Sequence, residues 1–277
     1  MESILFRFFQ PLTDKLISLD AAAALIPSGC SLALGGMTIY RRPMAFVRAL
    51  LKRYLREGKP KDLTLINFTS GLESDLLVGA GMVKRIRTCY FGLEIFGLAP
   101  MFTYFANRGE IEIVEETELS LALGLRAGIA RIGFMPGRAW LGTDLPRLRP
   151  DVRTIQDPYT GERLMAFPAI RPEFAVVHAL QSDPQGNAVL GENLGIDQEL
   201  LQASERFILT TEEIVPELAQ VDLIGPTIRE IALAPGGALP TSCHPLNPLD
   251  GEALLAYSEQ VSDPASFEVF LQKWLSD

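Results

Sequence analysis

Apolar runs of strand length alternate along the chain with stretches in which apolar residues recur at helical spacing. Strands are expected at residues 31–34, 63–68, 83–91, 111–115, 175–180 and 206–211. Helices are expected at residues 18–26, 44–56, 95–107, 117–131 and 197–204, with a last one within 264–275. Strands that alternate with helices over a whole chain favour a parallel sheet. The pattern therefore predicts an α/β protein with a mostly parallel, doubly wound sheet flanked by helices.

The segment 134–157 carries several prolines and glycines and is predicted to be rich in loops. It leads into residues 157–161, Asp-Pro-Tyr-Thr-Gly, which have the composition of a tight turn. No internal repeat, low-complexity tract or long linker divides the chain. We therefore expect one domain over residues 1–277, with residues 1–15 as a peripheral N-terminal extension.

The first expected strand ends in Gly35 and Gly36, and the chain then turns into a helix that starts near Pro43. Glycines let a backbone approach a ligand closely, and the first N–H groups of a helix have no partner within it. Such a turn suits a phosphate or a developing oxyanion. The alternative is a plain connection in which the glycines serve only the backbone geometry.

The turns that follow the expected strands should lie together. In a parallel sheet, ligands bind beyond the carboxyl ends of the strands. The turns concerned begin near residues 35, 69, 92, 116 and 182. The sequence therefore predicts a ligand site at this edge of the sheet.

The charge and the residue composition of the chain limit the kinds of molecule that it is expected to bind. The chain has 25 basic and 34 acidic residues, a net charge of −9, which argues against nucleic acid and against an anionic membrane surface. No run reaches the length of a membrane span, and residues 1–12 lack the basic region and cleavage site of a signal peptide. The 3 cysteines are widely spaced and odd in number, which fits a reducing cytoplasm.

Several standard sites are excluded by inspection. The chain contains no GxSxG, HExxH, GxxxxGK[ST] or complete GxGxxG motif. With only 2 histidines, a histidine-centred metal site is not expected, and His178 is interpreted as a hydrogen-bonded histidine near a strand end. Cys30 and Cys89 are interpreted as core residues and not as nucleophiles.

The residues around the glycine pair resemble a known signature. Leu32-Ala33-Leu34 is followed by Gly35-Gly36-Met37, three residues, Arg41, one residue and Pro43. This is similar to the N-terminal signature of the family I CoA-transferases, with three apolar residues, Gly-Gly-Phe, three residues, Gly, one residue and Pro. The chain departs from it with Met37 for Phe and Arg41 for Gly. A basic residue before the proline is similar to the A subunits of the glutaconate CoA-transferase branch, and the resemblance extends from about residue 16 to about residue 238.

The resemblance implies a fold, a reaction and a partner. In this family a glutamate within Ser-Glu-Asn-Gly attacks an acyl-CoA and then carries the CoA as a thioester. That motif is absent here, and the nearest string, Gly191-Glu192-Asn193-Leu194, lacks both its serine and its glycine. In two-subunit members the glutamate belongs to the B subunit. The chain is therefore expected to be an A subunit that is inactive without its B subunit, with a CoA thioester as substrate and no permanently bound cofactor or metal.

The A half is expected to contribute main-chain donors and a wall of the acyl pocket. Gly35 and Gly36 would support the oxyanion, with Met37 beside them. Glu118 is a candidate acid or base at the start of a helix; the alternative is that the acidic run 115–118 stabilises the helix N-terminus. Glu94 follows a strand in a Gly-Leu-Glu segment similar to one in the A subunits.

Four further residues are candidates for substrate binding. Arg41 and Arg42 would bind a substrate carboxylate, as a dicarboxylic acyl group requires, or would be solvated. Ser70 and Glu73 lie at the end of the second expected strand and would line the same pocket.

The predicted function is the exchange of CoA between an acyl-CoA and a small acid, with dicarboxylic acids included. One alternative on the same fold is an acyl-CoA hydrolase or decarboxylase that uses Glu118. Another is a non-catalytic ligand-sensing domain, although sensors of this kind usually carry a DNA-binding domain for which this chain has neither the length nor the basic charge.

Overall fold

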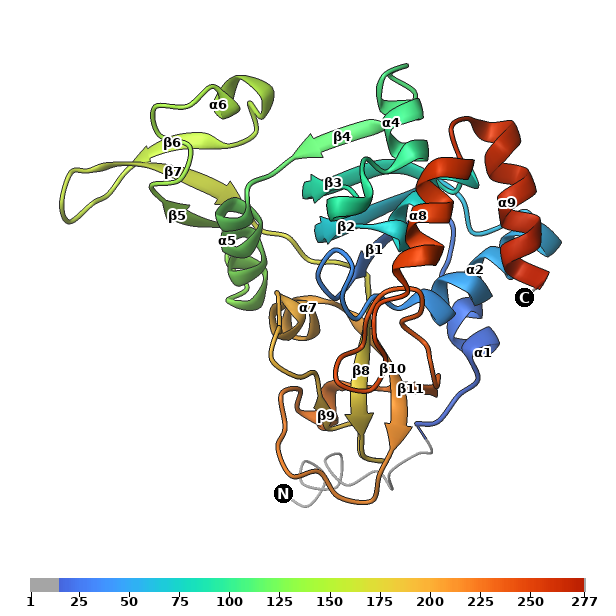
Figure 1. Cartoon of the computed structure of the whole chain (residues 1–277). Coiled ribbons are helices and arrows are strands. Elements are labelled where there is room, and N and C mark those ends of the chain that lie inside the picture. The colour runs from blue at the N-terminus through green and yellow to red at the C-terminus, as the bar shows by residue number, and fades with distance from the viewer. Residues whose placement is uncertain (1–14, 277) are drawn as a thin grey trace.

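A single large sheet dominates the computed structural model, which describes residues 15–276 (Figure 1). Within that range, 8 strands form this sheet, in the order β11-β10-β8-β1-β2-β3-β4, with β9 paired to β8. Each neighbouring pair on this path is parallel, and only β9 is antiparallel. The strands are β1 Ser31–Leu34, β2 Leu63–Ser70, β3 Val83–Phe91, β4 Glu112–Glu115, β8 Phe174–Ser182, β9 Ala188–Val189, β10 Arg206–Ile214 and β11 Glu230–Leu233. The predicted fold class is confirmed.

Helices cover both faces of the sheet, which explains why the central strands are continuously apolar. Leu32 and Leu34 of β1 belong to one core together with α2, while Ala33 between them belongs to the core on the opposite face. The first core also takes side chains from α1, α3, α4, α8 and α9, and the second takes them from α5 and α7. A strand that is buried on both faces has no polar side and reads as an unbroken apolar run.

Capping residues set the ends of several helices. The helices are α1 Leu19–Ala24, α2 Met44–Glu57, α3 Leu72–Gly79, α4 Pro100–Ala106, α5 Glu118–Ile129, α6 Leu145–Leu148, α7 Asp197–Ala203, α8 Gly251–Gln260 and α9 Pro264–Ser276, with 3-10 turns η2 Glu94–Phe96 and η3 Gly225–Thr227. Ser18 caps α1 by accepting from the Ala21 amide, and Gly58 ends α2 in a left-handed conformation. The predicted positions of α1, α2, α5 and α7 are confirmed to within a few residues.

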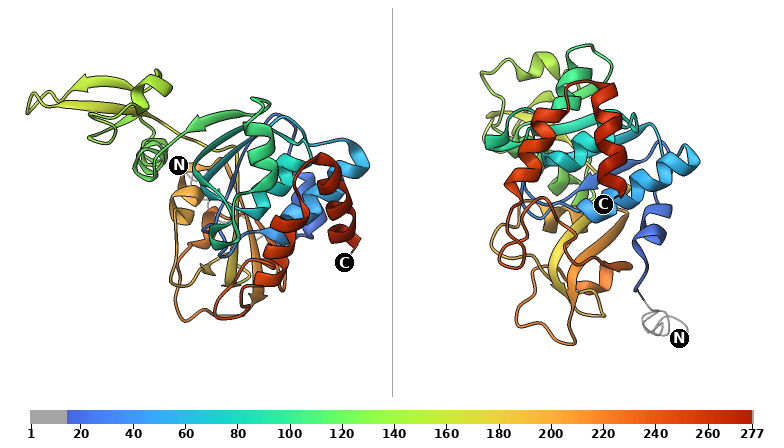
Figure 2. Two further views of the ribbon diagram at one scale, coloured as in Figure 1. Left: turned by 45° about the horizontal axis from the view of Figure 1, so that its top comes forward. Right: turned by 45° about the vertical axis from the view of Figure 1, so that its right-hand side comes forward.

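A second, antiparallel sheet projects from the main body, as Figure 2 shows. It is formed by β5 Phe134–Gly137, β7 Arg163–Pro168 and β6 Arg153–Gln156, and we call residues 134–168 the arm. Trp140 and Phe167 pack edge to face in its small core. The segment 134–157 is rich in loops as predicted, but the strands β5 and β6 within it were not predicted, because they acquire their pairing from β7 and not from local pattern. The turn predicted at 157–161 is confirmed as the β6–β7 connection.

The C-terminal helices complete the first core. The predicted helix within 264–275 is confirmed as α9, whereas α8 was not predicted. Along α8, buried Leu254 and Tyr257 are set among small and polar residues, so its sequence shows little of the apolar stripe that marks α2.

The N-terminal segment is described only from Lys15 onward. Of the predicted extension at residues 1–15, only Lys15 lies within the described range, where its Nζ donates to the main-chain oxygens of Gln185 and Gly225. The signal-peptide prediction for residues 1–12 falls outside that range. Among residues 15–276 we find no helix with the length and apolarity needed to cross a bilayer.

Candidate active site

The candidate site lies at the edge of the main sheet where the parallel strands end. From β1 the chain proceeds through β2, β3 and β4 on one side, and β8, β10 and β11 lie on the other. The strand order therefore reverses at β1, and ligands in doubly wound sheets bind at such a switch point. Gly35 directly follows β1, which puts the glycine turn there.

The two glycine amides are already engaged. The Gly35 amide donates to the Val176 oxygen at 2.9 Å, and the Gly36 amide donates to both carboxylate oxygens of Asp197 at 3.0 and 3.2 Å. Both glycines are buried. The prediction that these amides present free donors to an oxyanion is therefore contradicted in this chain, because β8 takes one donor and the first residue of α7 takes the other.

The glycines are nevertheless required by close packing. A Cβ on Gly35 would lie 2.5 Å from Asp197 Oδ1 and 2.6 Å from Val177 Cγ2. Gly36 has a φ of +83°, and its Cβ would lie 2.6 Å from the main-chain oxygens of Tyr40 and Arg41. The alternative interpretation, in which the pair serves the backbone geometry, fits these contacts.

Arg41 is a buried part of the turn. Its Nη1 donates to Asp197 Oδ2 at 2.7 Å and to the His178 oxygen at 2.8 Å, and its Nη2 donates to the Asn193 oxygen at 2.9 Å. The side chains of Arg41 and Asp197 are both 0% exposed. Asp197 thus joins α7 to the end of β1, and no motif in the sequence indicated this role.

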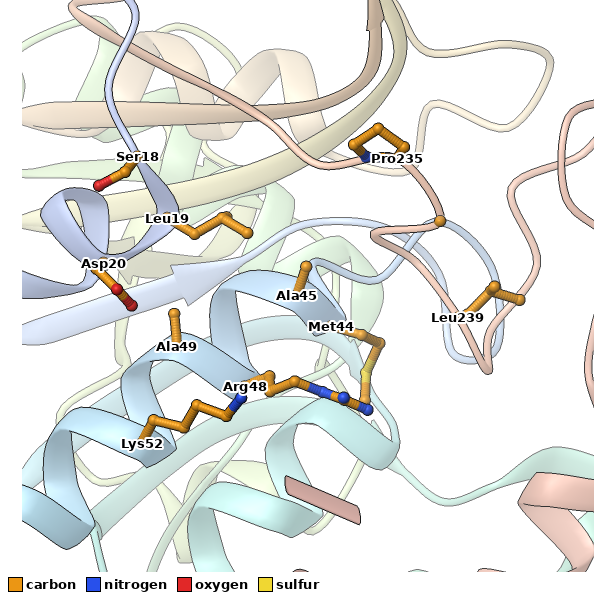
Figure 3. Close-up of a pocket in the computed structure, with 11 residues that line it drawn as sticks. Ser18, Leu19, Asp20, Met44, Ala45, Arg48, Ala49, Lys52, Pro235 and Leu239 are labelled. Atoms are coloured by element: carbon orange, nitrogen blue, oxygen red, sulfur yellow. The ribbon is translucent and has the colours of Figure 1, made fainter. Parts of the chain in front are cut away.

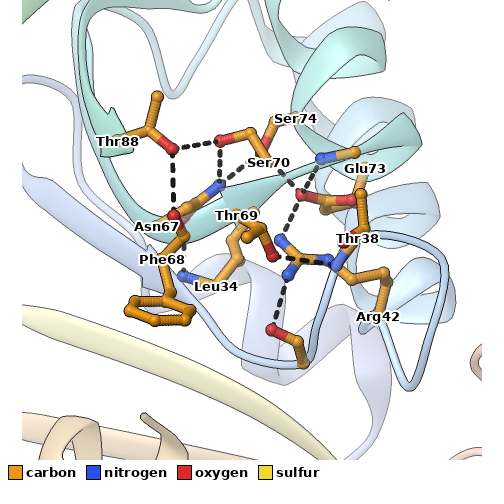
Figure 4. Close-up of polar contacts among 12 residues, drawn as sticks. Leu34, Thr38, Arg42, Asn67, Phe68, Thr69, Ser70, Glu73, Ser74 and Thr88 are labelled. Carbon is orange, nitrogen blue, oxygen red and sulfur yellow. Dashed lines mark hydrogen bonds and ion pairs between the residues drawn. The ribbon is translucent and has the colours of Figure 1, made fainter. Parts of the chain in front are cut away.

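Arg42 forms a second buried ion pair, with Glu73 of α3 (Figure 4). Its Nη1 also donates to the Gly36 oxygen at 2.9 Å, and the same Glu73 carboxylate accepts from Ser74 Oγ at 2.7 Å. Both side chains are 0% exposed. The interpretation of the arginines as solvated is wrong, and neither Arg41 nor Arg42 has an exposed donor for a substrate carboxylate.

Ser70 belongs to a buried hydrogen-bond network beside this pair, which Figure 4 also shows. Asn67 Nδ2 donates to Ser70 Oγ at 3.1 Å and to Ser74 Oγ at 2.5 Å, and Asn67 Oδ1 accepts from the Leu34 amide at 3.1 Å. Ser70 Oγ lies 3.3 Å from Thr88 Oγ1. Like Glu73, Ser70 is 0% exposed. Both side chains therefore belong to the buried network that packs against the turn and do not line an open pocket. Asn67 was missed, although an amide within an apolar strand is a recognisable signal.

Three candidates are more accessible at this edge. Met37 is half-buried, with its Sδ 3.9 Å from Thr69 Oγ1. Glu94 follows β3, is exposed, and has a φ of +55°. Non-glycine residues adopt that backbone conformation rarely, and such strain gathers at functional sites.

Glu118 is exposed at the first position of α5, directly beyond β4. Thr117 caps this helix, so the carboxylate of Glu118 is not needed as the cap. Burial, with a smaller contribution from Glu118, raises the pKa of Cys89 to about 12. The Cys89 thiol donates to the Phe68 oxygen at 2.5 Å. Cys89 is thus a protonated thiol beside Glu118, as expected for a residue that is not a nucleophile.

Glu116, which the sequence did not single out, is the buried member of the acidic run. It accepts from Arg87 Nε at 2.7 Å and from Arg149 Nη1 at 2.8 Å. Arg149 belongs to the arm, and Trp140 Nε1 of the arm donates to Thr117 Oγ1 at 3.0 Å. These contacts attach the arm immediately beside Glu118.

His178 lies beneath the turn, in the middle of β8. It is fully buried, and its ring nitrogens lie 2.9 Å from Thr210 Oγ1 and 2.9 Å from Glu212 Oε1. Burial lowers its pKa, although the Glu212 carboxylate opposes this shift. The interpretation as a hydrogen-bonded histidine is confirmed, but its expected place near a strand end is wrong, because β8 continues to Ser182. Cys243 completes a cluster of metal-binding side chain types with His178 and Glu212.

A surface cavity of about 540 Å³ lies elsewhere, between α1, α2 and residues 235–239 (Figure 3). Ser18, Asp20, Arg48 and Lys52 contribute its polar lining. None of the predicted site residues lines it.

The fold defines the class, an α/β protein with a mostly parallel, doubly wound sheet flanked by helices. A family model described as coenzyme A transferase matches residues 16–224. The chain belongs to the coenzyme A transferase family, and the resemblance found in the sequence is confirmed.

Three similar proteins illustrate the range of this family. The A subunit of 3-oxoadipate CoA-transferase from Pseudomonas knackmussii is 30% identical over 271 residues, which cover 95% of this chain and 94% of that protein. The IpdA subunit of a cholesterol ring-cleaving hydrolase from Mycobacterium tuberculosis is 33% identical over 282 residues, which cover 95% of this chain and 94% of that protein. The crystal structure of glutaconate CoA-transferase from Acidaminococcus fermentans superposes with a TM-score of 0.85 at 26% identity, covering 94% of this chain and 88% of that one.

Proposed function

We propose that this chain is the A subunit of a heteromeric CoA-transferase, which exchanges CoA between an acyl-CoA and a small carboxylic acid. The observation that carries the proposal is the family match over residues 16–224 in a chain that lacks Ser-Glu-Asn-Gly. The covalent glutamate then belongs to a B subunit, and the chain is inactive alone. CoA enters as a thioester substrate and not as a resident cofactor.

The proposed reaction divides between the two subunits. The B-subunit glutamate attacks the thioester carbonyl and releases CoA thiolate, which then attacks the resulting anhydride to give a glutamyl-CoA thioester and a free carboxylate. The A subunit supplies the rigid turn at Gly35 and Gly36 and the exposed carboxylates of Glu94 and Glu118. The commitment of Arg41 and Arg42 to Asp197 and Glu73 argues against their use for a dicarboxylic acid.

A second candidate is an acyl-CoA hydrolase or decarboxylase in which Glu118 acts as acid or base. The specific observation in its favour is that Glu118 is exposed at the site edge, and its side chain makes no hydrogen bond or ion pair with residues 15–276. The 33% identity to the IpdA hydrolase protein is also consistent with it. A general base must reach its substrate, which an exposed and unpaired carboxylate is able to do.

Borohydride trapping on the purified A–B complex separates the two candidates. With acyl-CoA present, transfer yields a reduced glutamyl residue on the B subunit, detected by mass spectrometry, and Glu118→Gln preserves this trapping. Hydrolysis or decarboxylation yields no trapped residue, and Glu118→Gln lowers turnover by about 10²-fold or more. Glu115→Gln, which changes an exposed neighbour, is the matched control. Saturable binding without turnover in the complex contradicts both candidates and favours a ligand sensor.

A further inference from the structure

Three side chains with metal-binding groups converge beneath the turn from separate parts of the chain. His178 lies on β8, Glu212 lies on β10, and Cys243 lies in the segment that follows β11. Their donor atoms all lie within 4.8 Å of one another, and all three residues are buried. We propose that these three residues form a zinc-binding site, separate from the strand-end site and independent of the proposed function.

The hydrogen bonds around His178 orient it as a metal ligand. Thr210 Oγ1 lies 3.4 Å from the Val177 oxygen, to which it donates, and 2.9 Å from His178 Nδ1. In the tautomer with the ring proton on Nδ1, the Thr210 hydroxyl accepts from the ring and Nε2 is left with its lone pair. The Nε2 lone pair then faces a Glu212 carboxylate oxygen at 2.9 Å, and two lone pairs at that distance require a cation or a proton between them. Fixing Nδ1–H with an oxygen acceptor is the usual second-layer contact of a zinc-bound histidine.

Charge balance also favours a cation here. Arg41 is paired with Asp197 and Arg42 with Glu73, whereas among residues 15–276 no lysine or arginine pairs with Glu212. The Glu212 carboxylate is held by the Gly236 amide at 2.5 Å and by the Asn247 side chain. A buried carboxylate without a counter-charge is costly. A divalent cation bound to Glu212 and to a Cys243 thiolate leaves the site neutral.

The ligand set and its spacing fit zinc. One thiolate, one imidazole and one carboxylate match the ligands of protein zinc sites, with Zn–S of about 2.3 Å and Zn–N of about 2.0 Å. Tetrahedral coordination at those lengths separates donor atoms by about 3.3 to 3.5 Å. Binding therefore requires movements of about 1 Å or less. It replaces the Cys243 thiol proton, which leaves to solvent, and forms bonds from zinc to sulfur, to His178 Nε2 and to a Glu212 oxygen.

A route for the metal lies beside the cluster. The cavity between α1 and α2 is lined by Pro235, which Figure 3 labels, and by Gly236. The Gly236 amide donates to the Glu212 carboxylate. Gly237 packs so closely that a Cβ there would lie 2.7 Å from His178 Cε1. The segment 235–237 thus contacts both this cavity and the cluster.

Metal content and cobalt spectroscopy test the proposal. The untagged A–B complex is stripped with a chelator, equilibrated with Zn²⁺ and measured by mass spectrometry of the metal. We expect about one zinc per copy of this chain, a loss of at least tenfold in Cys243→Ser, and no change in Cys89→Ser. Thr210→Val, which removes the oxygen that fixes the histidine, weakens zinc affinity by about 10- to 100-fold.

Cobalt identifies the ligands without relying on a variant. Co²⁺ in the wild-type complex should give a thiolate-to-cobalt charge-transfer band, so the proposal stays testable even where Cys243→Ser does not fold. Folded wild-type protein that retains less than a tenth of an equivalent of zinc overturns the proposal. Cobalt binding without the thiolate band, or a band that persists in folded Cys243→Ser, overturns it as well.

Discussion

At the scale of single residues, the turn after β1 depends on Gly35 having no side chain. The carboxylate of Asp197 and the methyl of Val177 occupy the space where a Cβ would project, at 2.5 and 2.6 Å. Asp197 in turn bonds the Gly36 amide and the Arg41 guanidinium. One missing side chain therefore permits a buried network that spans β1 and α7.

Gly35→Ala should destabilise the protein. The added methyl displaces buried groups with no room to move, and overpacking of this kind costs about 1–3 kcal/mol. The free energy of unfolding, measured by urea denaturation, should fall by that amount. Gly133→Ala is the control, since a Cβ there meets nothing within 4 Å, and an equal loss in the control would contradict the packing argument.

At the scale of elements, α8 and α4 meet at one buried carboxylate on α3. Asp75 accepts from Tyr257 Oη at 2.6 Å and from the Phe102 amide at 2.6 Å, which lies in the first turn of α4. Burial raises the pKa of Asp75 to about 6, even though these hydrogen bonds lower it. A group that joins three helices therefore also titrates near neutral pH.

The stability of the protein should fall as pH rises through this titration. The folded pKa of about 6 lies above the ordinary aspartate value of 3.8, so between these values the folded state binds more protons than the unfolded state. The unfolding free energy then decreases by up to about 1.4 kcal/mol per pH unit from pH 4 to 6. Asp75→Asn should remove this pH dependence. Glu259→Gln, on the α8 helix that also carries Tyr257, should keep it.

Urea denaturation at several pH values measures both variants against the wild type. Parallel wild-type and Asp75→Asn curves between pH 4 and 6 would show that Asp75 does not titrate in this range. Asp75→Asn should also be less stable at every pH, because an amide nitrogen cannot accept from the α4 amides.

At the scale of the whole molecule, the arm and the main sheet are joined by charges. Arg149 of the arm is 6% exposed and donates to Glu116 Oε1 and to the Glu115 oxygen, at 2.8 and 2.9 Å. Its other nitrogens bind Asp151, which holds the guanidinium in place. The position of the arm beside Glu118 thus depends on a contact between segments distant in sequence.

Arg149→Ala should loosen the arm while leaving the main sheet intact. Removing one partner leaves Glu116 buried with Arg87 as its remaining cation, at a cost of about 1–3 kcal/mol. Hydrogen exchange in residues 134–168 should accelerate by about 10-fold or more, with β1 and β2 unchanged. Arg163→Ala, at an exposed arm residue, is the control. Unaltered exchange in the arm would show that other contacts hold it.

Much of the main sheet could be predicted, and the arm could not. Residues 32–34 are continuously apolar, and residues 175–180 are apolar except for His178, because both faces of these strands are covered. This pattern is visible in the sequence without knowledge of the neighbouring strands. The strands β5 and β6 are short and have exposed positions, and β5 contains Pro136. Their pairing with β7 is a tertiary property, so the local pattern indicated a segment rich in loops and neither strand.

The same division holds for the site. The sequence by itself determined the doubly wound fold class, the family signature at Gly35 and Gly36, and the placement of Glu94 and Glu118 after strands, because these depend on neighbours along the chain. Only the tertiary structure decided that Arg41 and Arg42 are buried and paired. The partner of Arg41, Asp197, is 156 residues away in the sequence, and the partner of Arg42, Glu73, lies on α3. Burial sets whether a charge meets solvent or a counter-charge, and burial depends on which segments pack together.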